Sequence, residues 1–233
     1  MLVRASKIKS AVLDLLYPRF CVACGREGAF ICSDCYRSLR RIVPPVCPLC
    51  GSPQASGLLC SRCVGWWASI DGIRSPFQFE GVMRSAIHQL KYRNLRAIAS
   101  TLAHFLGDYY RDGPIPADVL VPVPLHPRRL KERGYNQSLL LARELSRLVG
   151  LPLISNCLVR TGAAYSQART ENVKQRWENV VGAFSCRYRI MKGSRVLLID
   201  DVTTSGATLD ACAAAIKDAG AASVWGLVLA REI

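Results

Sequence analysis

Two adjacent carboxylates followed by small and hydroxylated residues stand in the stretch VLLIDDVTTSGATL, residues 196–209. The aliphatic run 196–199 predicts a buried strand, and Asp200 and Asp201 are expected where that strand ends. The turn after them should place backbone N–H groups and hydroxyls at the start of a helix, which favours an anion. Carboxylates accept hydrogen bonds from sugar hydroxyls and the turn donates to phosphate, so a ribose 5-phosphate satisfies both. The turn residues expected to hold the phosphate are Thr203, Thr204, Ser205, Gly206, Ala207 and Thr208.

This stretch has two other possible interpretations. A Walker B strand also ends in acidic residues that bind magnesium, but it requires a GxxxxGK[ST] phosphate loop, which the sequence lacks. A strand–turn–helix junction without a ligand is the second alternative. It is disfavoured because an unpartnered Asp pair suffers desolvation and like-charge repulsion.

Eight of the 11 cysteines form four CxxC pairs between residues 21 and 63. A secreted disulfide framework fits poorly, since there is no export signal and Cys157, Cys186 and Cys212 would remain unpaired. Two closed four-cysteine zinc sites fit better, and metal binding would then supply much of the folding free energy of this segment. Consecutive pairing gives the sets Cys21, Cys24, Cys32, Cys35 and Cys47, Cys50, Cys60, Cys63. Crossed pairing, first with third and second with fourth, stays open.

Basic residues gather in two further segments. The first is LHPRRLKERGY, residues 125–135, which follows a predicted strand and contains Arg128, Arg129, Lys131 and Arg133. The second contains Arg84, Lys91, Arg93 and Arg96, with Tyr92 between them. Its cations are expected to follow a phosphodiester backbone while the ring stacks on a base. A solvated loop and an exposed helix face are the alternatives for the two segments.

The elements around these residues alternate between strands and helices. Strands are expected at 72–80, 118–124, 196–199 and 223–230, and helices at 82–92, 95–110, 136–149 and 208–220. Alternation of this kind predicts an α/β fold, a mostly parallel sheet with flanking helices that binds its ligand beyond the carboxyl ends of the strands. The chain divides into an N-terminal amphipathic segment (1–20), a Cys-rich double zinc ribbon (21–66) and this α/β domain (67–233).

The net charge and the distribution of apolar residues indicate the kind of partner and the cellular compartment. The 233 residues carry 31 Lys and Arg against 17 Asp and Glu, a net charge of +14, which favours an anionic partner such as nucleic acid, a phosphorylated metabolite or acidic lipid. No apolar stretch is long enough to span a bilayer and no signal-peptide cleavage site is present, so a cytoplasmic protein is expected. The basic, amphipathic start favours either peripheral contact at the inner face of a membrane or docking on its own chain.

Residues 196–208 closely resemble the thirteen-residue signature of type I phosphoribosyltransferases, although Thr203 stands where those proteins usually have an aliphatic residue. The whole chain resembles more narrowly the ComF/GntX family of competence and DNA-utilisation proteins. The segments LLYPRFCVACG, IHQLKY and VPVPLHPRRLKERGYNQS carry this resemblance, as does the Gln167, Arg176, Asn179 spacing before VVGAF. The resemblance implies that the acidic pair holds the ribose hydroxyls of phosphoribosyl pyrophosphate with magnesium. It also implies that residues 125–135 form the pyrophosphate loop.

Three functions remain as hypotheses. The first is a phosphoribosyl-pyrophosphate-binding protein that handles single-stranded DNA in uptake or use of external DNA, with DNA-uptake or recombination proteins as further partners. The second is an authentic transferase, in which Asp200 and Asp201 orient the ribose while a nucleobase or ammonia displaces pyrophosphate. The third is a structural adaptor. The sequence shows no acceptor pocket, and it leaves the oligomeric state open.

Overall fold

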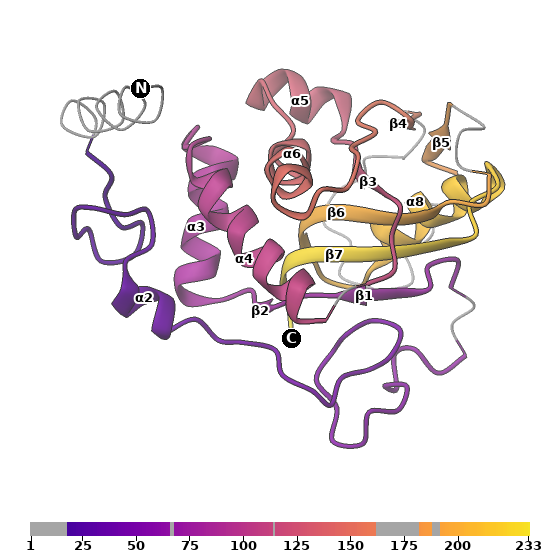
Figure 1. Ribbon diagram of the computed structural model, residues 1–233, viewed down its shortest axis with the longest axis horizontal. Helices are drawn as coiled ribbons and strands as arrows, with labels where there is room; N and C mark the ends of the chain where they lie inside the picture. The colour runs from indigo at the N-terminus through magenta and orange to yellow at the C-terminus, as the bar shows by residue number, and fades with distance from the viewer. Residues whose placement is uncertain (1–17, 66–67, 114, 162–181, 188–191) are drawn as a thin grey trace.

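The computed structural model describes residues 18–65, 68–113, 115–161, 182–187 and 192–233 (Figure 1). The expected amphipathic segment up to residue 17 and the Gln167, Arg176, Asn179 spacing lie outside these residues. The helices are α2 (Ser33–Arg37), α3 (Gly81–Tyr92), α4 (Ile98–Asp112), α5 (Pro127–Arg133), α6 (Gln137–Val149) and α8 (Ala207–Asp218). The strands are β1 (Gly72–Arg74), β2 (Phe77–Gln78), β3 (Val119–Pro122), β4 (Leu158–Arg160), β5 (Phe184–Cys186), β6 (Arg195–Thr203) and β7 (Ser223–Arg231).

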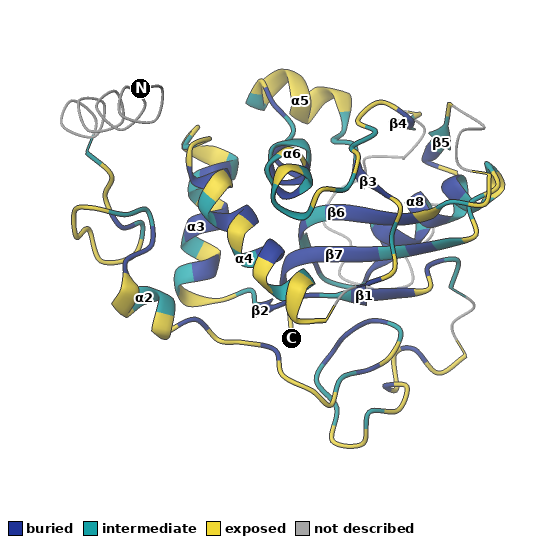
Figure 2. Cartoon of the chain, in the orientation of Figure 1, coloured by how far each residue is buried: buried dark blue, intermediate teal, exposed yellow. Residues whose placement is uncertain are grey.

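The main sheet has the strand order β1-β7-β6-β3, and β2 pairs with β7 beyond β1. All of these pairings are parallel, which confirms the predicted α/β fold class. Most residues of strands β6 and β7 are buried (Figure 2). This is expected for central strands whose sequences are continuous aliphatic runs. The ligand of such a sheet is expected beyond the carboxyl ends of β3 and β6.

Helices cover both faces of this sheet (Figure 1). Helices α3, α4 and α6 bury their apolar sides on one face, and α8 packs on the other together with the small antiparallel sheet β4-β5. The start of α6 is capped because Asn136 Oδ1 accepts from the Ser138 N–H at 2.9 Å, and Gly150 ends the helix in the left-handed region. Among the described residues, no helix combines the length and apolar composition needed to cross a bilayer.

The two Cys-rich units, at residues 21–36 and 47–63, contact different parts of the α/β domain. In the first, the Tyr36 ring lies 5.0 Å from the Phe105 ring of α4. In the second, the turn at 48–51 binds the edge strand β1, where the Ile73 N–H donates to the Leu49 carbonyl at 2.7 Å. Gly51, at φ 74°, permits this approach, since a Cβ there would lie 2.4 Å from the Ile73 carbonyl oxygen. Both units therefore contact the α/β domain directly.

Three predicted elements differ from the structure. The strand expected at 72–80 is divided into β1 and β2. Strand β6 continues to Thr203, because β7 runs beside it and pairs Asp200 with Val228. The basic segment 125–135, for which a loop is expected, contains helix α5, whose first residue is Pro127 and whose C-cap, Gly134, is left-handed. The acidic pair therefore lies within a paired strand, and the basic segment has a defined shape.

Candidate ligand site and metal centres

The acidic pair on β6 is held by two neighbouring helices. The Ser138 hydroxyl at the start of α6 donates to Asp200 Oδ1 at 2.7 Å, and the Asp201 N–H donates to the same oxygen at 2.9 Å. Lys91, near the end of α3, places Nζ 2.8 Å from Asp201 Oδ2. The Asp201 side chain is only 3% exposed and that of Lys91 is 20% exposed, so this ion pair is largely shielded from water.

Burial and the charge of Asp201 change the acidity of Asp200. Burial is the larger cause, and together they raise the pKa of Asp200 to about 7, against the opposing effects of the Ser138 hydroxyl and Lys91. The surroundings of Asp200 thus favour its neutral form more than those of an exposed carboxyl do. A perturbed carboxyl at the ligand-binding edge of a parallel sheet is typical of functional sites.

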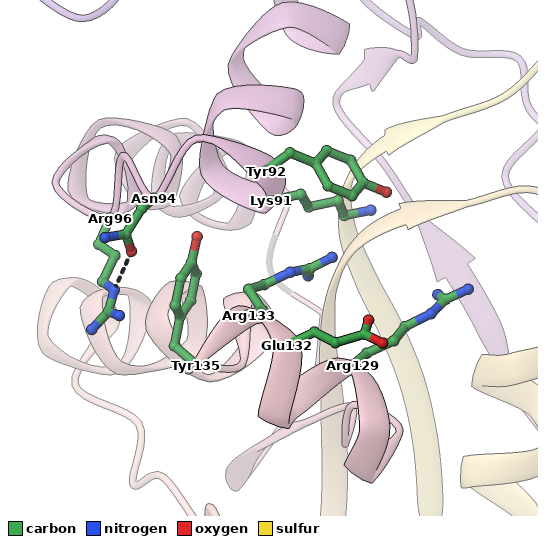
Figure 3. A pocket seen from close by; sticks show the side chains of 8 residues that line it. All are labelled: Lys91, Tyr92, Asn94, Arg96, Arg129, Glu132, Arg133 and Tyr135. Atoms are coloured by element: carbon green, nitrogen blue, oxygen red, sulfur yellow. Dashed lines mark hydrogen bonds between the residues drawn. The ribbon is translucent and has the colours of Figure 1, made fainter.

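The two basic segments meet in one cleft of 590 Å³ (Figure 3). The end of α3 and the turn after it form one wall, and α5 with the residue that follows Gly134 forms the other. The lining residues are Lys91, Tyr92, Asn94, Arg96, Arg129, Glu132, Arg133 and Tyr135. Because Lys91 belongs both to the cleft and to the ion pair with Asp201, the cleft adjoins the acidic pair.

Arginine–aromatic contacts order this cleft. The Arg96 guanidinium lies 4.4 Å from the Tyr135 ring centre, and the Arg133 guanidinium lies 5.4 Å from that of Tyr92. Arg133 also donates to the Gln137 side chain, and the Tyr135 hydroxyl donates to the Leu90 carbonyl. These contacts hold two cations in place, whereas Tyr92, whose ring also lies 4.9 Å from that of His88, is 66% exposed as a residue. The cleft thus offers cations for phosphate and an open ring for stacking.

The remaining predicted residues lie apart from the cleft lining. Arg84, Arg93, Arg128 and Lys131 are exposed on the same elements, and Arg128 pairs with Glu132 at 3.1 Å. Lys91, predicted to contact nucleic acid, lines the cleft and forms an ion pair with Asp201. Sequence reasoning missed Ser138 and Tyr135, although the polar start of the helix at 136–149 pointed toward the first.

The hydroxyl-rich turn follows directly after β6. Thr203 is the last residue of the strand, and Ala207 and Thr208 begin α8. Gly206 adopts φ 86°, a left-handed conformation that favours glycine, and the Ser205 hydroxyl accepts from the Ala207 N–H at 3.4 Å. The glycine conformation and this hydrogen bond thus help to define the shape of the turn.

The eight cysteines form two separate clusters by consecutive pairing. Within each set, Cys21–Cys24–Cys32–Cys35 and Cys47–Cys50–Cys60–Cys63, all Sγ atoms lie within 4.8 Å of one another. The Cys24–Cys32 and Cys50–Cys60 sulfurs are 3.6 and 3.7 Å apart, close to the separation of about 3.8 Å that four Zn–S bonds of about 2.3 Å require in a tetrahedron.

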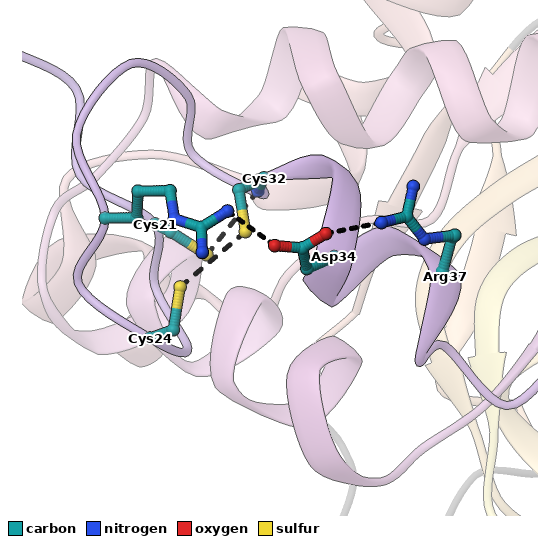
Figure 4. A network of polar contacts seen from close by, with 6 residues as sticks. Cys21, Cys24, Cys32, Asp34 and Arg37 are labelled. Carbon is teal, nitrogen blue, oxygen red and sulfur yellow. Dashed lines mark hydrogen bonds and ion pairs between the residues drawn. The ribbon is translucent and has the colours of Figure 1, made fainter.

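In both clusters a backbone N–H group points at a cysteine sulfur, as is typical of metal-bound thiolates. Charged side chains also lie beside the first cluster. The Cys32 N–H points at Cys21 Sγ from 3.5 Å, and the equivalent Cys60 N–H points at Cys47 Sγ from the same distance. Beside the first cluster, Asp34 bridges Arg26 and Arg37 (Figure 4). The thiol set fits a structural zinc ion in each cluster.

Comparisons with known proteins agree with this architecture. A family model described as a double zinc ribbon domain matches residues 12–64, and one described as a phosphoribosyl transferase domain matches residues 88–232. The chain is 31% identical over 212 residues to competence protein ComFC of Bacillus subtilis, covering 87% of this chain and 84% of that protein. It is 32% identical to competence protein F of Haemophilus influenzae, with 86% and 90% covered.

A third relative is named for DNA utilisation. The DNA utilization protein YhgH of Escherichia coli K12 is 32% identical over 221 residues, covering 92% of this chain and 95% of that protein. Together, the two domain matches and the three relatives span both the Cys-rich module and the parallel sheet. The chain therefore belongs to the ComF/GntX family of competence and DNA-utilisation proteins, which join a double zinc ribbon to a phosphoribosyltransferase domain.

Proposed function

We propose that the protein binds phosphoribosyl pyrophosphate with magnesium beside the acidic pair, and single-stranded DNA in the adjoining basic cleft, during the uptake or use of external DNA. The names of the relatives support a role with DNA, and the phosphoribosyltransferase domain supports the ligand. One observation carries the proposal: Lys91 belongs at once to the basic cleft and to the ion pair with Asp201.

The chemistry of the acidic site suits a ribose that carries a 5-phosphate and a pyrophosphate. Asp200 and Asp201 accept hydrogen bonds from the ribose hydroxyls, and the turn 204–208 holds the 5-phosphate. The pyrophosphate reaches toward the cations of the cleft, of which Arg129 and Arg133 lie on α5. Magnesium, when bound with the ligand, neutralises the pyrophosphate oxygens. The magnesium ion also adds positive charge beside Asp201, the buried carboxylate that Lys91 neutralises.

Single-stranded DNA suits the outer part of the same cleft. The exposed Tyr92 ring offers a stacking surface, and Arg93 and Arg96 are placed to contact successive phosphates. Single strands are favoured over duplex because their bases are free to stack. The net charge of +14 adds long-range attraction for a polyanion.

Calorimetry with phosphoribosyl pyrophosphate and magnesium tests the first ligand. Asp200→Asn combined with Asp201→Asn should abolish binding, since neutral amides replace two anionic acceptors whose hydrogen bonds contribute about 1.5–3 kcal/mol each. Asp108→Asn, an exposed carboxylate on α4 that pairs with Arg111, is the control and should bind as the wild type does. Unchanged affinity in the double variant would refute the assignment.

Transferase activity is the second candidate, favoured by one observation. The cleft beside the acidic pair is lined by the exposed Tyr92, whose ring offers a planar acceptor a stacking surface that the sequence alone did not reveal. Incubating the protein with phosphoribosyl pyrophosphate, magnesium and single nucleobases, while following pyrophosphate release, separates the two candidates. Release that depends on one base establishes the transferase, and binding without release establishes a ligand-binding role.

Zinc is proposed for both four-cysteine clusters. Metal analysis of protein purified without chelator should give two zinc ions per chain. Substituting Cys47 and Cys50 with Ser should remove one of them, because the second cluster then keeps only two thiolates. A stably folded wild type free of metal would overturn the assignment.

A further inference from the structure

A buried carboxylate in the first turn of α8 takes no part in the ligand contacts described above. Asp210 is 9% exposed, and its Oδ1 accepts from the Ser69 N–H at 2.7 Å and from the Ile70 N–H at 2.9 Å. A carboxylate taken out of water is costly unless such donors replace the lost hydration. This side chain therefore makes a specific connection between α8 and the segment that leads into β1.

Asp210 is also attached to the turn that is proposed to hold the 5-phosphate. Its own N–H donates at 3.0 Å to the carbonyl of Gly206, the left-handed N-cap of α8. Residue 210 thus contacts the turn through its backbone and residues 69–70 through its side chain. The N–H groups at the start of a helix have no partners within the helix, and they are the donors that bind a phosphate there. A shift of this first turn would therefore move the phosphate donors with it.

Apolar packing joins the same two segments. A Cβ at Gly226 of β7 would lie 3.2 Å from Leu209 Cδ1 and 3.4 Å from Ile70 Cδ1, so both side chains approach this glycine closely. Leu209 and Ile70 are 1% and 2% exposed. Because a close-packed interior resists small displacements, this packing and the two hydrogen bonds together leave the first turn of α8 little freedom to shift.

The other attachment between these segments lies away from the turn. Lys217, in the last turn of α8, places Nζ 2.8 Å from Asp71 Oδ1. Asp71 Oδ2 also accepts from the Val224 N–H at 2.6 Å, so this carboxylate keeps a partner when Lys217 is replaced. Lys217 therefore offers a matched comparison with Asp210, at the opposite end of the same helix and against the same segment.

We propose that Asp210 is a positioning residue of the phosphate site: by binding the backbone of residues 69 and 70, it holds the first turn of α8 in the orientation that a 5-phosphate needs. This inference rests on the proposed binding of phosphoribosyl pyrophosphate at the turn 204–208. Residues 69–70 follow the second Cys-rich unit in the chain. The phosphate site thus depends on a segment outside its own strand, turn and helix.

The oxygen atom of Asp210 carries this role, and its negative charge does not. A carboxylate near a phosphate would by itself weaken binding through repulsion between like charges. Burial also raises the pKa of Asp210, against the opposing effect of the two N–H groups, so the surroundings tolerate a neutral side chain. An Asn side chain presents the same acceptor without the charge and therefore separates the two properties.

The test is calorimetric binding of phosphoribosyl pyrophosphate with magnesium to the full-length protein, purified without chelator. Asp210→Ala removes both hydrogen bonds and should weaken binding about fivefold or more, the lower limit of the coupling usually measured between linked sites. The loss should be of similar size for ribose 5-phosphate, which lacks the pyrophosphate. Asp210→Asn should bind at least as tightly as the wild type, and Lys217→Met should match the wild type.

Amide hydrogen exchange of the free protein is the second measurement. Exchange at residues 206–210 should be faster in Asp210→Ala than in the wild type, whereas Asp210→Asn should match the wild type. If Asp210→Ala fails to fold, Asp210→Ser is measured in its place. Wild-type affinity or wild-type exchange in the folded Ala or Ser variant would overturn the inference while leaving the proposed ligand intact, as would an equal loss in Asp210→Asn. A wild type that binds neither ligand would overturn both.

Discussion

Replacing Lys91 with Met tests whether the ion pair with Asp201 is part of the fold. The substitution keeps the length of the side chain and removes its charge, leaving a carboxylate that is 3% exposed without its cation. Breaking a buried ion pair costs about 3–5 kcal/mol, and because Lys91 is 20% exposed we expect the lower limit, about 3 kcal/mol. At about 2–4 °C per kcal/mol for a chain of this size, the melting temperature should fall by roughly 6–12 °C.

The assay is thermal unfolding of zinc-loaded protein followed by circular dichroism. Arg93→Met is the matched control, since Arg93 is an exposed cation two residues further along, and it should change the melting temperature little. A double-mutant cycle with Asp201→Asn isolates the pair, because Lys91→Met should cost less than about 1 kcal/mol once residue 201 is neutral. If the two substitutions destabilise additively, the contact contributes nothing and the reasoning fails.

Two further predictions concern the ligands. Because ribose hydroxyls donate to the ionised form of Asp200, whose pKa is raised to about 7, affinity for phosphoribosyl pyrophosphate should fall about tenfold from pH 8 to pH 6. Ser138→Ala removes a hydrogen bond to that ionised form and should move the fall to higher pH in calorimetric titrations; coincident midpoints would contradict this. Affinity for a labelled oligonucleotide should fall steeply with salt in anisotropy measurements. Replacing Arg93 and Arg96 together should reduce the log–log slope by about 1.4, two contacts at about 0.7 each, and an unchanged slope would exclude them as phosphate contacts.

Local patterns in the sequence predicted the elements with strong periodicity and the metal centres. Helices α3, α4 and α6 carry apolar residues three and four apart, and β6 and β7 read as aliphatic runs, so their positions followed directly. Each cysteine cluster uses neighbours in the chain, and consecutive pairing could be favoured from spacing alone. Helix α5 was missed because it is short and highly charged, although Pro127 and Gly134 marked its two ends.

Contacts between distant residues were beyond the sequence. Lys91, near the end of α3, reaches Asp201 on β6, and a surface helix with several cations gives no sign of which one is buried. The extension of β6 past the acidic pair depends on β7, which follows it in the chain. Arg231 lies just beyond the strand predicted at 223–230, and nothing in the sequence indicates that it is buried.

Asn136 links the two ends of the basic segment. Its Nδ2 donates to the Val123 carbonyl at 2.9 Å, and its Oδ1 caps α6 through Ser138, so one side chain fastens the end of β3 to the start of the next helix. The segment 124–135 is closed at its base, like an Ω-loop. The charge of its exposed residues can therefore be changed without disturbing the sheet. For engineering, this segment is a natural place to exchange ligand specificity by grafting.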